Sequence, residues 1–215
     1  MSTTGLIQLY YDFREVLRRE RKKIAALQLT GRLEEYLTHE FGYHIYRGSR
    51  GRLFVITNYG AQGQSRIDIV VLKPGKPDGQ PYIKALVEAK YLRNAHRLGD
   101  HTAHDETRQA LSGLARQLKR SAGFRHGEYE VRLSARRKEI YGLVFGSYVA
   151  GGARAPRLPK DEFYQDCLDR AIQAGLRYHD LNNPAWREVF DDVDVAVLGR
   201  KYQVSLKMGL WRLAE

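Results

Sequence analysis

Apolar residues in the first forty positions recur at helical spacing. After the cap-forming residues 2–4, the apolar positions are Leu6, Leu9, Tyr10, Phe13, Val16 and Leu17. The spacing resumes at Leu29, Leu33, Leu37 and Phe41, and the following Gly42 is a typical residue to end a helix. The pattern therefore predicts two N-terminal helices, the second ending near residue 42.

The later segments alternate between strand and helix patterns. Helical spacing covers 103–121, with Leu111, Leu114, Ala115 and Leu118 as the buried stripe, and a further helix starts at Asp161. Strand patterns cover 43–47, 53–57, 67–72, 84–90, 139–150, 193–198 and 202–206. The helix between 84–90 and 139–150 predicts that these two strands are parallel. The fold class is α/β, with a mixed sheet, helices on both faces, and a C-terminal helix and β-hairpin.

Two of these strands are predicted to form a hairpin. Pro77-Asp78-Gly79 is a turn sequence, because Pro presets φ, Asp bonds its own backbone and Gly accepts a positive φ. With a three-residue loop at 77–79, Asp68 faces Glu88 across the ladder. Lys90 is two residues beyond Glu88 and so lies on the same face.

Two carboxylates and a lysine on one face indicate either a metal site or an ordinary surface ion pair. Mg²⁺ prefers oxygen ligands and takes one or two carboxylates together with water and phosphate oxygens. In that case Asp68 and Glu88 lie near solvent in a cleft, and Lys90 orients or deprotonates the attacking water. In the other case Glu88 and Lys90 form a salt bridge on an exposed face.

The residues Ile67-Asp68 and Glu88-Ala89-Lys90, separated by the length of a hairpin, resemble the PD-(D/E)XK nuclease superfamily, whose fold is restriction-endonuclease-like. The resemblance covers roughly residues 25–148. The literal Pro-Asp pair is Pro77-Asp78, but Asp78 sits at the turn, tens of ångströms from Glu88 at ~3.3 Å per residue. Asp68 is therefore taken as the motif aspartate. We expect an N-terminal helical extension over 1–24, a nuclease core over 25–150 and a C-terminal addition over 151–215.

The resemblance also implies further site residues. Asp68, Glu88 and the Ala89 carbonyl would hold Mg²⁺ or Mn²⁺, and Lys90 would position the nucleophilic water. Relatives often place a glutamate on the helix before the first motif strand; Glu34 is the first choice here, with Glu35 and Glu40 as alternatives. A glutamine on the helix after the lysine corresponds to Gln109 or Gln117. The implied activity is Mg²⁺-dependent endonucleolytic hydrolysis of nucleic-acid phosphodiesters, with DNA favoured over RNA.

Charge supports a polyanionic partner. The chain has 215 residues, with 36 Lys and Arg against 25 Asp and Glu, a formal net charge of +11. Double-stranded DNA is the expected partner, and a homodimer is left open. The expected phosphate contacts are Arg47, Arg50 and Arg52 in a turn, and Arg116 and Arg120 on the helix after the lysine.

The remaining composition concerns location and partners. Cys167 is the only cysteine, which excludes an intramolecular disulfide and favours a reducing, cytoplasmic setting. No apolar run is long enough to span a membrane. The alternatives to an active nuclease are a non-catalytic nucleic-acid-binding module and a nuclease subunit that needs a partner. Asp191, Asp192 and Asp194 form a rival acidic cluster, although no lysine follows them at the motif spacing.

Overall fold

The computed structural model describes residues 3–29, 33–59, 67–75, 81–94, 103–122, 139–151, 156, 158–178 and 186–213, and omits the side chains of 3, 4, 103–109, 121, 122 and 178. The described helices are α1 (Thr3–Arg19), α2 (Arg21–Gln28), α3 (Leu33–Gly48), α4 (Ala103–Ala122) and α5 (Lys160–Gln173). The strands are β1 (Phe54–Tyr59), β2 (Ile67–Lys73), β3 (Tyr82–Arg93), β4 (Glu139–Gly151), β5 (Leu176–Tyr178), β6 (Arg187–Val197) and β7 (Arg200–Leu213).

The strands form one seven-stranded mixed sheet flanked by helices, in the order β1-β2-β3-β4-β7-β5, with β6 also paired to β7. The β3–β4 pair is parallel and the other pairs are antiparallel. The parallel pair flanks α4 in the chain, which confirms the crossover predicted from the sequence. None of the described helices is long and apolar enough to cross a membrane.

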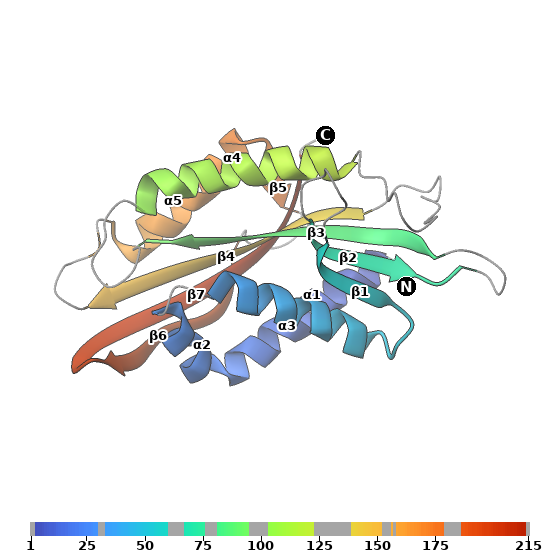
Figure 1. Ribbon diagram of the computed structural model, residues 1–215. Coiled ribbons are helices and arrows are strands. Elements are labelled where there is room, and N and C mark those ends of the chain that lie inside the picture. Colours follow the sequence, from blue (N-terminus) through green and yellow to red (C-terminus); the bar gives the residue numbers. More distant parts are fainter. Residues whose placement is uncertain are drawn as a thin grey trace.

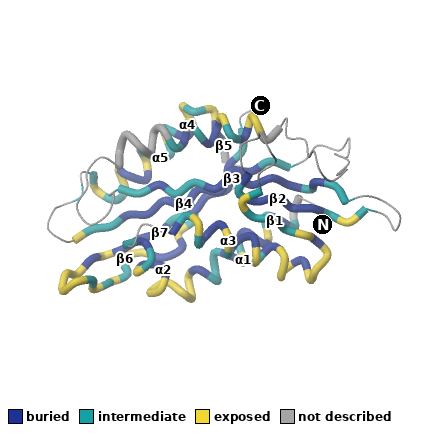
Figure 2. The backbone as a smooth tube through the Cα atoms, in the orientation of Figure 1, coloured by how far each residue is buried: buried dark blue, intermediate teal, exposed yellow. Residues whose placement is uncertain are grey.

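Helices cover both faces of the sheet (Figure 1). α1, α2 and α3 lie on one face, where Phe13, Phe41 and Val87 belong to one buried cluster. α4 and α5 lie on the other face, where Leu114 and Val144 belong to a second cluster. Because successive side chains of a strand point to opposite faces, a single strand such as β4 contributes to both clusters. The buried residues accordingly line the sheet and the inward sides of the helices (Figure 2).

The helix α3 is longer than the sequence pattern indicated. It continues through Gly42 to Gly48, so the predicted strand over 43–47 is wrong. The apolar spacing that runs through Leu37 and Phe41 reaches Ile45, which is fully buried. At Gly42 the helix packs closely against β1, since a Cβ there would lie 2.7 Å from Thr57 Cγ2. The glycine therefore allows a helix and a strand to approach and does not end the helix.

The C-terminal hairpin predicted about Gly199 is confirmed, and both its strands are longer than predicted. β7 pairs with β4 from Gly142↔Trp211 to Gly151↔Tyr202, so it is an interior strand of the sheet. Cys167 of α5 is buried, and burial raises the pKa of its thiol. Ile172 of the same helix is 58% exposed, although its helical spacing from Cys167 and Leu168 predicts that it lies on the buried face. The division of the chain at residues 24 and 150 stays a prediction.

Candidate active site

The predicted hairpin register is confirmed where it matters for the two acids. Ile69 pairs with Val87, and continuing the ladder by one residue sets Asp68 opposite Glu88. A bulge between Val71 and Leu72 shifts the pairing toward the tip of the hairpin. The predicted Lys76–Gln80 pair and the turn around Asp78 lie outside the described residues.

The β2–β3 ladder gives way to a side-chain contact at Asp68. The Asp68 Oδ2 accepts a hydrogen bond of 2.7 Å from the backbone N–H of Ala89. Asp68 is partly buried, whereas Glu88 is only 2% exposed. The expectation that both acids lie near solvent is therefore wrong for Glu88, because the strands on either side and the helical layer cover this part of β3.

A second carboxylate approaches the same side of β3. Glu34, in the first turn of α3, lies close enough to the Tyr91 backbone N–H for this donor to favour the ionised carboxylate. Alternate residues of a strand direct their backbone groups to the same side, so Ala89 and Tyr91 offer successive donors. The Ala89 carbonyl lies between these two donors and faces the same side.

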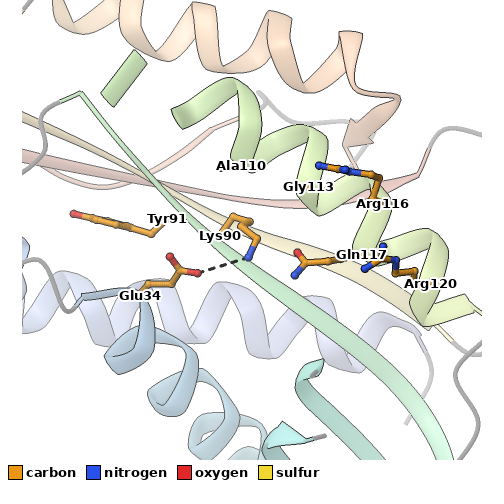
Figure 3. Close-up of a pocket in the computed structure, with 8 residues that line it drawn as sticks. All are labelled: Glu34, Lys90, Tyr91, Ala110, Gly113, Arg116, Gln117 and Arg120. Carbon is orange, nitrogen blue, oxygen red and sulfur yellow. Dashed lines mark ion pairs between the residues drawn. The ribbon is translucent and has the colours of Figure 1, made fainter. Parts of the chain in front are cut away.

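Lys90 lies beside Glu34. Its Nζ is 3.9 Å from Glu34 Oε1, which makes a loose ion pair rather than a hydrogen bond (Figure 3). Its neighbour Leu92 packs in the cluster under α4, so by alternation Lys90 projects to the α4 side. Tyr91 instead packs toward the α1–α3 cluster.

The carboxyl of Glu34 is harder to ionise than usual. Loss of hydration raises its pKa, and the negative charge of Asp68 raises it further. Lys90, the Tyr91 N–H and Arg93 oppose the shift without cancelling it. Because Glu34 senses the charges of both Asp68 and Lys90, the three side chains form one electrostatic group, and a bound cation would favour the ionised carboxylate.

A pocket of about 460 Å³ lies between this group and α4. Its walls are Glu34, Lys90, Tyr91, Ala110, Gly113, Arg116, Gln117 and Arg120 (Figure 3). The α4 members recur every three or four residues, on the flank beside the buried stripe. The two smallest of them, Ala110 and Gly113, leave the space open: a Cβ at Gly113 would meet no atom within 4 Å.

The structure separates the residues predicted to bind substrate. Arg116 and Arg120 line the pocket. Arg47, Arg50 and Arg52 are exposed at the other end of α3, about 20 Å along the helix axis from Glu34. They therefore do not belong to the pocket.

Of the two glutamines that the resemblance implies, Gln117 is the one whose side chain the structure describes. The side chain of Gln109 lies outside the described residues, whereas Gln117 extends from α4 toward Lys90 (Figure 3). Among the described residues, the buried Oε1 of Gln117 has no hydrogen-bond partner. Sequence reasoning missed Gly113, although its spacing from Gln117 and Arg120 was a usable signal.

The oxygen atoms at the end of β2 fit a hard divalent cation. The Ala89 carbonyl belongs to the residue whose N–H Asp68 accepts, Glu34 responds to the charge of Asp68, and Glu88 precedes Ala89 on β3. No group of three or more His, Cys, Asp or Glu with metal-ligand geometry occurs in the described part of the chain. Mg²⁺ does not need such a group, because it keeps several waters and uses only one or two carboxylates.

The rival acidic cluster is held by a lysine. Lys160 Nζ lies 2.8 Å from Asp191 Oδ1 and 3.0 Å from Asp192 Oδ2. Asp192 also accepts a hydrogen bond from Ser205 Oγ. These contacts fix the irregular part of β6 against β7 and α5.

Comparisons with protein-family models, with curated proteins and with solved structures gave no match for this chain. Function is therefore inferred from the geometry of the described residues.

Proposed function

We propose that this protein is a metal-dependent nuclease with a restriction-endonuclease-like core, which hydrolyses phosphodiester bonds of nucleic acid, with DNA favoured over RNA. One observation carries the proposal. Asp68 Oδ2 holds the Ala89 amide of β3, and Glu34, whose pKa responds to the charge of Asp68, forms an ion pair with Lys90 of the same strand. This arrangement gathers oxygen ligands and one cationic side chain at the rim of a basic pocket.

Asp68, Glu88 and the Ala89 carbonyl are the residues that would hold Mg²⁺ or Mn²⁺. When bound, the cation polarises the phosphate and stabilises the charge that develops on the leaving oxygen. The Ala89 N–H fixes the orientation of Asp68, and the rigid β3–β4 pair fixes Glu88. The ligands are thus placed by backbone pairing before any substrate arrives, which is what electrostatic preorganisation requires.

Lys90 orients the attacking water or balances the charge on the phosphate. Its ion pair with Glu34 is long and partly exposed, so it contributes little stability and leaves the ammonium able to turn toward a substrate. Glu34 sits where it can accept a proton from a water, since its raised pKa brings it closer to the working range of a general base.

The test is cleavage of DNA with and without Mg²⁺. Wild type should cut in Mg²⁺ or Mn²⁺ and stop in EDTA, and Asp68→Asn should lose cleavage while keeping its fold. Asp194→Asn is the matched control, because it removes a carboxylate from exposed β6. Cleavage by Asp68→Asn at the wild-type rate would refute the assignment. Salt-sensitive DNA binding without cleavage under any of these conditions would instead indicate a non-catalytic binding module or a subunit that needs a partner.

A further inference from the structure

We infer that the pocket between β3 and α4 receives one unpaired nucleotide next to the bond that is cut, so that the substrate is single-stranded or locally unpaired nucleic acid. This inference rests on the proposed function and specifies its substrate. It is carried by the size of the pocket, by its charges and by the open space over Gly113.

Size comes first. A volume of about 460 Å³ lies within the range of roughly 300–1,000 Å³ that holds a single small ligand. A base pair within a duplex is stacked on both sides, so a base must leave the stack before it can enter such a space. Leaving the stack is unfavourable in a duplex and costs least where the base is already unpaired.

The charges suit a nucleotide phosphate. Lys90 on β3 faces Arg116 and Arg120 on α4 across the pocket, and Glu34 is the carboxylate among the described residues that line it. Arg116 and Arg120 are one helical turn apart, so their guanidinium groups project from the same flank of α4. Guanidinium groups bind phosphate oxygens in bidentate fashion, which gives both affinity and orientation.

Gln117 supplies a group that can contact the base or sugar. Its Oε1 is buried and has no hydrogen-bond partner among the described residues. A buried acceptor without a donor is unfavourable, so a ligand N–H or O–H at this point would be favoured. An unpaired base exposes such donors on its pairing edge, whereas a paired base has already used them.

Gly113 allows a direct test, because larger side chains there point into open space. Gly113→Leu should fill the pocket, and helix propensity favours Leu over Gly, so folding should be preserved. Gly113→Ala is the matched control, since it makes the same backbone change and adds only one methyl group. Ala110→Leu fills the same pocket from one turn away and serves as a second variant should Gly113→Leu fail to fold.

Binding is measured first, by titration calorimetry with thymidine 5′-monophosphate at low salt in EDTA. Wild type and Gly113→Ala should bind alike, and Gly113→Leu should bind at least ten-fold more weakly. Thymidine without the phosphate should bind more weakly to all three proteins. Equal binding of the monophosphate by Gly113→Leu and Gly113→Ala, or no binding by wild type, would overturn the inference.

Cleavage is measured next, in Mg²⁺, on two covalently closed duplex circles that differ only in a short unpaired bubble. Wild type should cut the bubbled circle at least ten-fold faster, and Gly113→Leu should lose this preference. Equal rates on both circles would overturn the inference while leaving the nuclease assignment intact. No cleavage of either circle or of single strands would refute the proposed function. The binding measurement alone would then show whether the pocket holds a nucleotide.

Discussion

The Asp68 carboxylate accepts a hydrogen bond from the Ala89 backbone N–H at 2.7 Å, across the point where β2 and β3 separate. Ala89 is fully buried, so its N–H has no access to solvent water. Asp68 is therefore both a candidate metal ligand and a structural partner for the neighbouring strand. Substitutions at this position must distinguish the two roles.

Asp68→Ala should lower the free energy of unfolding by about 1–3 kcal/mol, because it leaves the buried Ala89 N–H without an acceptor. Asp68→Asn keeps a carbonyl oxygen in place, so its free energy of unfolding should fall by less than half as much. Urea unfolding in EDTA measures both variants without any contribution from bound metal. Equal stability of Asp68→Ala and Asp68→Asn would show that the hydrogen bond does not matter for folding.

Lys90→Ala should reduce the cleavage rate by ~10²-fold or more, the scale of one lost electrostatic or acid–base contribution, with little change in DNA affinity or melting temperature. Lys90→Arg should recover little, because guanidinium differs in shape and does not deprotonate. Lys84→Ala is the control, since Lys84 lies on the same strand with a similarly exposed side chain, 23% against 21%. Single-turnover cleavage and filter binding on the same preparations separate rate from affinity; parallel losses in both would assign Lys90 to binding.

The pKa of Glu34 is 4.5 in the unfolded chain and higher in the folded protein. The free energy of unfolding should therefore fall as the pH rises from 4.5 through the folded pKa. In that window the folded state binds more protons than the unfolded state, so raising the pH favours unfolding. Glu34→Gln removes this titration, and its stability relative to wild type should increase with pH across the same window. The measurement is urea unfolding at low salt from pH 4 to pH 8. A difference between the two proteins that does not change with pH would contradict the shift.

Gly42→Ala should destabilise the protein, although alanine is normally better than glycine within a helix by up to ~1 kcal/mol. The added methyl group would lie 2.7 Å from Thr57 Cγ2. Thr57→Ser removes that methyl and keeps the hydroxyl, which lies 3.0 Å from His39 Nδ1. In a double-mutant cycle, Thr57→Ser should therefore restore stability in the Gly42→Ala background and not in wild type. Additive effects would show that α3 and β1 can move apart.

Local rules predicted the parts of the fold that depend on neighbouring residues. Strand alternation and turn residues sufficed for the register around Ile69 and Val87. The crossover rule sufficed for the parallel β3–β4 pair, because the two strands and the helix between them follow one another in the chain. The same local rules failed at Gly42. A glycine is needed there because β1 packs closely against α3, and this contact cannot be predicted from the residues next to Gly42 in the chain.

The site was predictable in part for a similar reason. Asp68, Glu88 and Lys90 are linked by a single hairpin, so spacing alone brings them together. The approach of Glu34 to Lys90 could not be predicted, because it depends on how α3 packs against β3. The pocket depends on the separation between α4 and β3, which is set by the packing of the whole helical layer.

The Asp68 carboxylate that holds the Ala89 amide has a consequence for the choice of an inactive control. Ala89 is fully buried, so its N–H can find a partner only inside the fold. A variant that removes this acceptor would lose a structural contact together with a candidate metal ligand. Asp68→Asn, which keeps an oxygen atom at this point, is therefore the inactive variant of choice for binding measurements.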